Sequence, residues 1–138
     1  MNEIRNGYYR VSVKALVLNE TRDKFFICEE ESGIWELPGG GLDWGTTPQE
    51  DLPREIVEEM GIVVSHVANN PSYFITDQNT DKTLWIANVL YETTLDNLDF
   101  TRLMSVNIRF VDKVDIKNMN VYSTVRKLAE MFNPVNHT

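Results

Sequence analysis

Cysteine and histidine are scarce in this sequence, and their scarcity limits the chemistry it can perform. The 138 residues include one cysteine, Cys28, and two histidines, His66 and His137. A lone cysteine forms no intramolecular disulfide, and no Cys/His cluster predicts a zinc site. Neither histidine has an evident partner, so we predict that Cys28 is simply a small buried residue without a catalytic role.

Long apolar runs are also missing. No stretch approaches the ~18 apolar residues that a transmembrane helix needs, and the N-terminal segment MNEIRNGYYR lacks the basic-then-apolar pattern of a signal peptide. We therefore expect a cytoplasmic protein with no membrane partner.

Basic residues are in deficit as well. The chain has 13 lysines and arginines against 21 aspartates and glutamates, which gives a net charge of −8. Binding of long nucleic acid requires a basic face, so the charge argues against that function. A small phosphorylated ligand remains compatible with this charge, because metal ions bound to carboxylates invert the local charge.

The apolar pattern predicts one domain over residues 1–138. Apolar residues alternate over 8–19, and apolar-rich or β-branched runs follow, which predicts strands. The expected strands are 8–19, 24–30, 34–37, 62–67, 73–76, 82–94 and 107–111. Helical spacing predicts helices over 47–60 and 121–132. This order predicts an α+β domain, a layered α/β/α sandwich with a central mixed β-sheet. The first two strands are expected to form a hairpin, and residues 133–138 to fray.

Residues 33–62, GIWELPGGGLDWGTTPQEDLPREIVEEMGI, form the most informative stretch. Thr47 and Glu50 form a capping-box pattern with Pro48 at the first helical position, and Gly61 suits the residue after the helix. At 3.6 residues per turn, Leu52, Ile56, Val57 and Met60 share one face of this helix, and Glu55, Glu58 and Glu59 share the opposite face.

The three glutamates have two interpretations. Glutamates on a polar helix face are usually only solvated, and for an arbitrary REIVEE that interpretation leads by roughly four to one. Here Gly39, Gly40 and Gly41 precede the helix and allow the backbone to approach a ligand closely, although such glycines also suit a flexible turn. Together the two features favour a site for a hard divalent cation, which prefers carboxylate oxygens and would relieve the like-charge repulsion.

This stretch resembles the Nudix box of the Nudix hydrolases. The family pattern is Gly, five residues, Glu, seven residues, Arg-Glu, an aliphatic residue, any residue, Glu-Glu, any residue, Gly and an aliphatic residue. The matching residues here are Gly40, Arg54, Glu55, Ile56, Glu58, Glu59, Gly61 and Ile62. The resemblance implies the Nudix fold and a pyrophosphatase activity, the hydrolysis of the pyrophosphate bond of a nucleoside diphosphate derivative such as a nucleotide, nucleotide sugar or dinucleotide.

The resemblance also implies roles for individual residues. Glu55, Glu58, Glu59 and the carbonyl of Gly39 would bind magnesium or manganese, Mg²⁺ or Mn²⁺, and Arg54 would orient a glutamate, with Arg54 and the three glutamates forming the catalytic set. Gly40, Gly41 and Trp44 are the expected substrate-binding residues, with Trp44 stacking on a base. Trp85, Tyr73 and Phe74 are alternatives, although aromatic residues more often serve packing. Because many family members form dimers, the resemblance is also compatible with a homodimer.

The chain departs from the family pattern at two positions, and a further acidic residue of the family has no clear match here. Thr46 stands where the pattern has its first glutamate, and either Asp43 or Asp51 is a candidate to compensate. Pro53 lies inside the expected helix, where proline removes a hydrogen bond and can kink the helix. A further acidic ligand in the 95–107 loop has only Asp96 and Asp99 as candidates. These departures motivate an alternative function, a catalytically weak nucleotide-binding or regulatory module.

Overall fold

The computed structural model describes residues 7–96 and 106–138, and its strands form two sheets. The larger sheet contains β1 (Tyr9–Leu16), β4 (Gly39–Gly41), β5 (Val64–Val67), β6 (Tyr73–Gln78) and β7 (Trp85–Leu95). The smaller sheet contains β2 (Phe25–Glu29), β3 (Trp35–Glu36) and β8 (Ile108–Val111). The helices are α1 (Pro48–Met60) and α2 (Ser123–Met131), with short 3₁₀ helices η2 (Asp115–Asn118) and η3 (Pro134–His137).

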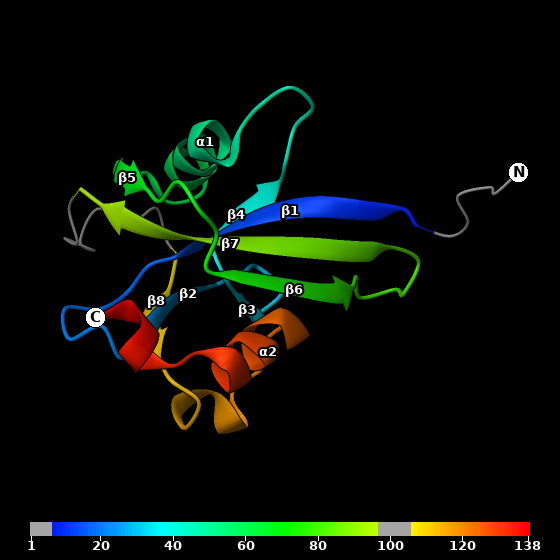
Figure 1. The fold of residues 1–138 in the computed structure, drawn as a ribbon. Helices are drawn as coiled ribbons and strands as arrows, with labels where there is room; N and C mark the ends of the chain where they lie inside the picture. Colours follow the sequence, from blue (N-terminus) through cyan, green and yellow to red (C-terminus); the bar gives the residue numbers. More distant parts are fainter. Residues whose placement is uncertain (1–6, 97–105) are drawn as a thin grey trace, which may run out of the picture.

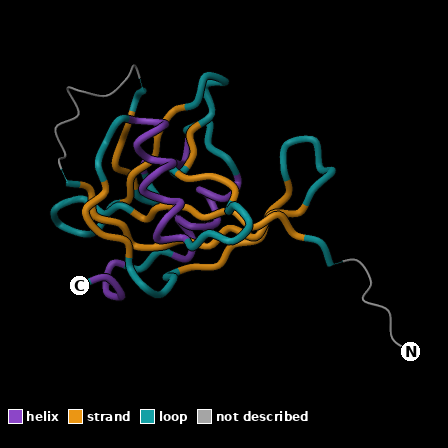
Figure 2. Tube along the Cα trace, turned by 90° about the horizontal axis from the view of Figure 1, so that it is seen from above, coloured by secondary structure: helices purple, strands orange, loops and turns teal. Residues whose placement is uncertain are grey.

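Strand β7 is the centre of the larger sheet. It pairs with β1 in parallel and with β5 and β6 antiparallel, while β4 pairs antiparallel with the other edge of β1. The larger sheet is therefore mixed, as the sequence predicts. Figure 1 shows α1 on one side of the strands and α2 on the other, which confirms the layered arrangement with a helix on each side. The view from above in Figure 2 shows a helix lying across the near side of the strands.

Two apolar cores hold these layers together. Alternation along β1 directs Val13 and Ala15 into a core with Leu52, Ile56 and Met60 of α1. The opposite faces of the strands contribute to a second core with α2, which includes Leu16, Phe25, Leu90, Val125 and Leu128. Because side chains of a strand alternate between faces, one strand serves both cores.

The structure clarifies three expectations of local structure. The hairpin expected from the first two strands is limited to its turn end, where Leu18 bridges Phe25 and the Phe26 N–H donates to the Val17 carbonyl. Beyond that point β2 pairs with β3 and β8 instead of β1. The glycines do not form the flexible turn that was their alternative interpretation, because Gly39–Gly41 is the edge strand β4. The backbone hydrogen bonds of these glycines with β1 hold them in an extended strand, whereas composition alone suggests a flexible segment.

The C-terminal segment is not frayed either. It forms η3 and buries His137, whose Nε2 lies 2.6 Å from the Tyr73 hydroxyl. The ring of His137 stacks on Phe132 at a centroid distance of 5.1 Å. His137 therefore has a partner, Tyr73, from a strand that lies far away in the sequence.

None of the helices within the described residues is long and apolar enough to cross a membrane.

Candidate metal and phosphate site

The start of α1 agrees with the sequence prediction. The Thr47 side chain accepts a hydrogen bond from the Glu50 backbone N–H, and the Glu50 side chain accepts one from the Thr47 N–H, so the capping box is complete. Gly61 ends the helix in the left-handed conformation, with φ of 67°. α1 is one continuous helix through Pro53, so the proline does not break it.

The glycines of β4 bring the backbone against the acidic side of α1. A Cβ atom built on Gly40 would lie 2.9 Å from Cδ of Glu55, which is closer than real contacts allow. The Gly39 backbone N–H lies near the Glu59 carboxylate and lowers its pKa. Glycine at position 40 therefore leaves the space that the Glu55 carboxylate occupies.

Glu59 lies in an unusual electrostatic environment. Its pKa is raised to about 7, first because neighbouring protein atoms desolvate the carboxylate and then because Glu55 is close; Lys14 and the Gly39 N–H act in the opposite direction. A carboxylate that resists ionisation in this way gains from a nearby divalent cation, which favours its charged form.

Lys14 is a residue that the sequence reasoning missed. It pairs with Gly39 in the register of β1 and β4, and its positive charge lowers the pKa of Glu59 and of the desolvated Glu36. The signal was present in the sequence, since Lys14 lies on the polar face of the first strand. Recognising it required the pairing of β1 with the glycine strand.

Arg54 holds two of the three box glutamates. Its Nη1 lies 3.2 Å from Oε2 of Glu58, and its Nη2 lies 3.3 Å from Oε1 of Glu55. Nη2 also lies 3.1 Å from Oδ2 of Asp43 in the turn before the helix. These ion pairs raise the pKa of the Arg54 guanidinium, with Glu58 the main cause.

The buried carboxylate of Asp51 completes this group. Its residue is 1% exposed, and its Oδ2 accepts a hydrogen bond of 2.9 Å from the Asp43 backbone N–H. The Thr46 hydroxyl oxygen lies 2.9 Å from the same Oδ2, and Nη2 of Arg54 lies 3.6 Å from Oδ1. The hydrogen bond from Asp43 is the largest cause that holds the pKa of Asp51 below its usual range, so Asp51 is ionised at neutral pH.

The donors fit a hard divalent cation, although they do not form a finished cage. Within residues 7–96 and 106–138, no three acidic, histidine or cysteine side chains converge as metal ligands. The charge of Glu55 raises the pKa of Glu59, which places the two carboxylates near each other. Both Glu55 and Glu58 are paired with Arg54. Carboxylates and backbone carbonyls are the ligands that Mg²⁺ and Mn²⁺ prefer.

The remaining candidates are more scattered. Trp44 is fully exposed in the turn between β4 and α1, and a Cβ atom on Gly41 would collide with the Arg10 guanidinium. Asp96 follows β7, and its N–H donates to the Val63 carbonyl at 2.8 Å. Asp99 lies outside the described residues.

Cavities adjoin the site on the side of Glu59. One of about 500 Å³ is lined by Gly39, Glu59, Cys28, Leu37 and Tyr122, among others. A polar cleft of about 270 Å³ shares Tyr122 with it and continues past Lys14, Glu36 and Asn88. Burial raises the pKa of the Cys28 thiol to about 12, which agrees with its predicted inert role.

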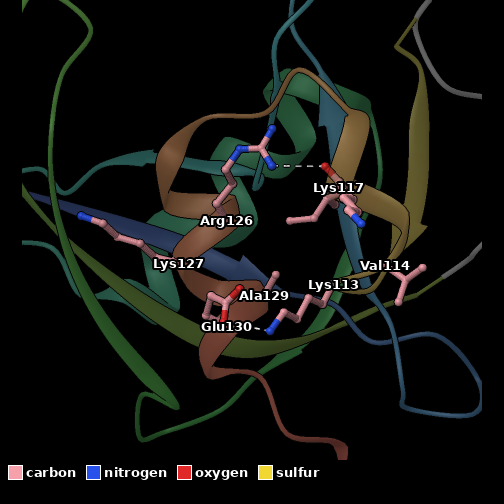
Figure 3. Close-up of a pocket in the computed structure, with 8 residues that line it drawn as sticks. Lys113, Val114, Lys117, Arg126, Lys127, Ala129 and Glu130 are labelled. Atoms are coloured by element: carbon pink, nitrogen blue, oxygen red, sulfur yellow. Dashed lines mark hydrogen bonds and ion pairs between the residues drawn. The ribbon is translucent and has the colours of Figure 1, made fainter.

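Another cavity, of about 540 Å³, lies apart from this group and is lined by residues that follow β8 and by α2 (Figure 3). Its charged side chains are largely paired with nearby protein groups: Lys113 lies 3.0 Å from Glu130, and Arg126 donates to the Ile116 carbonyl. It contains none of the box residues.

A mixed sheet between two helices, with an acidic helix packed beside a glycine edge strand, is the architecture of the Nudix hydrolases. The family model described as NUDIX domain matches residues 8–117, and the chain belongs to this family. Its members hydrolyse nucleoside diphosphate derivatives and generally need divalent metal ions.

Individual relatives agree with this assignment. A MutT-like protein of Streptomyces ambofaciens is 41% identical over 56 residues, a match that spans 41% of this chain and 36% of the relative. The MutT NUDIX hydrolase of Burkholderia pseudomallei has a TM-score of 0.66 at 18% identity, covering 92% of this chain and all of that one. A NUDIX hydrolase of Nitrosomonas europaea has a TM-score of 0.69 at 14% identity, covering 94% and 90%. At these identities the solved structures show a shared fold.

Proposed function

We propose that this protein is a Mg²⁺- or Mn²⁺-dependent pyrophosphohydrolase that cleaves a nucleoside diphosphate derivative. The observation that carries the proposal is the placement of the Glu55 and Glu59 carboxylates against the glycine strand β4, with Glu58 between them in the sequence of the same helix. The family match over residues 8–117 supports the same reaction.

Each residue of the group has a task in this reaction. Glu55, Glu58, Glu59 and the carbonyl of Gly39 would hold the metal, which when bound polarises the phosphoanhydride and activates a water molecule. Arg54 restrains Glu55 and Glu58 through its ion pairs. For Glu58 to join the other two carboxylates, its side chain must turn away from Arg54.

The bond changes are those of a hydrolysis. The oxygen of water bonds to one phosphorus atom of the pyrophosphate, and the bridging P–O bond breaks. The two products each retain a phosphate group, and the protons of the attacking water pass to solvent or to a product oxygen. The cavity beside Gly39 and Glu59 is the proposed location of the group attached to the phosphates, and Lys14 is a proposed phosphate contact.

The experiment that tests this function is a hydrolysis panel with metal dependence. Purified protein is incubated with nucleoside triphosphates, nucleotide sugars and dinucleotides, with Mg²⁺ and separately with Mn²⁺, and the products are resolved by chromatography. We expect at least one compound to be cleaved at its pyrophosphate bond and the reaction to stop when the metal is chelated.

Variants identify the site responsible. Glu58→Gln and Glu59→Gln should each lower kcat by on the order of 100-fold or more, because each removes a charged ligand. Glu130→Gln is the matched control, since Glu130 pairs with Lys113 on α2 and should leave the rate unchanged. An unchanged rate in Glu58→Gln would reveal a contaminating enzyme. Nucleotide binding without turnover would favour the binding or regulatory module.

A further inference from the structure

The buried carboxylate of Asp51 lies next to the position where the Nudix box lacks its first glutamate. Burial of a carboxylate is unfavourable unless it is paired and hydrogen-bonded. Asp51 meets that condition: its Oδ2 accepts from the Asp43 N–H and lies 2.9 Å from the Thr46 hydroxyl oxygen, and its Oδ1 faces Arg54. Asp51 thus ties the turn before α1 to the helix itself.

The geometry relates positions 46 and 51 directly. Because Thr46 Oγ1 is 2.9 Å from Asp51 Oδ2, a longer acidic side chain at position 46 would reach the space that the Asp51 carboxylate fills. A glutamate side chain extends two bonds beyond the γ position of the threonine hydroxyl. A carboxylate can therefore reach the same buried space from position 46 or from position 51, and in this protein the Asp51 carboxylate occupies it.

Asp51 is also the least exposed partner of Arg54. Its side chain is 2% exposed, whereas those of Asp43 and Glu58 are 61% and 58% exposed. Exposed ion pairs contribute little and are readily exchanged for water, so they fix an arginine poorly. A buried carboxylate that accepts a backbone hydrogen bond is held in one position, so it restrains the guanidinium more than an exposed carboxylate does.

We propose that Asp51 is a positioning residue that supplies from the helix the buried carboxylate absent from position 46. It fixes the 43–46 turn and the Arg54 guanidinium, and through Arg54 the side chain of Glu55. This inference rests on the proposed hydrolase function for its kinetic consequence, whereas its structural consequence for Arg54 stands apart from any turnover.

The test moves the carboxylate between the two positions. Four proteins are compared: the wild type, Asp51→Ala, Thr46→Glu, and the double variant Thr46→Glu/Asp51→Ala. Asp51→Ala should lower kcat by up to about 100-fold with little change in KM, because misplaced catalytic groups mainly affect the chemical step. Thr46→Glu alone should also lower kcat, because two carboxylates then compete for one buried place. The double variant should recover to within about 10-fold of the wild type, because the substitutions compensate each other.

A second measurement needs no substrate. The side-chain Nε–Hε signal of Arg54, assigned by its loss in Arg54→Lys, is followed by NMR in the same four proteins without metal. We expect a well-dispersed signal in the wild type, a collapse toward the position of free arginine in Asp51→Ala, and restoration in the double variant. If no protein hydrolyses any substrate but the Arg54 signal follows this order, the hydrolase proposal fails and the positioning role stands.

Circular dichroism and thermal unfolding of all four proteins separate positioning from folding. If Asp51→Ala does not fold, the double variant still decides, since a folded double variant with a restored Arg54 signal supports the relocation. The proposal is overturned if the double variant is unfolded, or is as impaired as Asp51→Ala. A rate increase in Thr46→Glu alone would likewise overturn it, because the native site would then lack a carboxylate that Asp51 does not supply.

Discussion

Gly39 and Gly40 are adjacent glycines with different physical requirements. A Cβ atom on Gly40 would meet the far end of the Glu55 side chain, which is flexible and can move. A Cβ atom on Gly39 would meet the rigid backbone of Val13 and Lys14, at a φ of 136° that disfavours side chains. Glycine at position 39 is therefore required by the close pairing of β4 with β1. Glycine at position 40 is required by the position of the Glu55 carboxylate.

Alanine substitutions should separate these requirements. We expect Gly40→Ala to leave the thermal midpoint near that of the wild type while lowering Mn²⁺ affinity by about 10-fold or more, because Glu55 is displaced. Gly39→Ala should instead lower the free energy of unfolding by about 2 kcal/mol or more, because backbone strain and overpacking add. Calorimetric titration and chemical denaturation measure the two effects. Equal loss of stability in both variants would contradict the distinction.

Helix α1 combines a strong local start with an interior proline. Its capping box and the proline at position 48 favour the first turn, where backbone N–H groups have no helical partner. Pro53 lies beyond that turn, and it cannot donate to the carbonyl of Gln49 as another residue would. The cap and the apolar face therefore stabilise a helix that contains a local defect.

Removing the defect should stabilise the protein. We expect Pro53→Ala to raise the free energy of unfolding by about 1 kcal/mol, because it restores a helical hydrogen bond and removes the clash of the ring with the preceding turn. Pro48→Ala is the matched control at the first helical position, where the change should be small or slightly destabilising. Urea denaturation measures both. A loss of stability in Pro53→Ala would mean that the half-buried ring contributes more through packing than it costs in hydrogen bonding.

The molecule as a whole carries excess negative charge, and α1 concentrates part of it. Arg54 is the basic residue that offsets the acidic group of α1, and it is shared among Asp43, Asp51, Glu55 and Glu58. Glu59 is left to Lys14 and the Gly39 N–H. A bound divalent cation would relieve this imbalance in the folded state only, so metal binding and folding stability are linked.

Thermal unfolding should report this linkage. At about 100 times its dissociation constant, a metal that binds the native state stabilises it by about 2.7 kcal/mol, which corresponds to a rise of the midpoint on the order of 5–10 °C. We expect that rise with Mn²⁺ and a much smaller one in Glu59→Gln, with Glu130→Gln behaving as the wild type. An equal rise in all three proteins would place the metal elsewhere.

The features predictable from sequence are those that depend on neighbours along the chain. The cap at Thr47, the helix end at Gly61 and the apolar face with Leu52 and Ile56 follow from local spacing, and the structure confirms them. The mixed sheet and the two covering helices follow from the order of the elements.

The remaining features depend on pairing between distant segments. Strand β2 turns away from β1 to join β8, and Lys14 faces the acidic group because β1 pairs with β4. His137 is buried because Tyr73 and Phe132 form its contacts. Alternation of apolar residues with a period of two identifies a strand but not the strand with which it pairs. The sequence pattern therefore could not predict these contacts.

The position of β7 has a consequence for the order in which the protein is made. Strand β1, which carries β4 and the site beside it, pairs along its whole length with β7, from Tyr9 with Trp85 to Leu16 with Glu92. During synthesis the complete box, ending at Ile62, leaves the ribosome more than twenty residues before β7 begins. Pairing between segments that are distant in the sequence forms late in folding. The nascent chain therefore contains every residue of the box before β1 and β7 can pair and assemble the site. The box is therefore a unit of sequence, whereas the unit that folds extends at least to the end of β7.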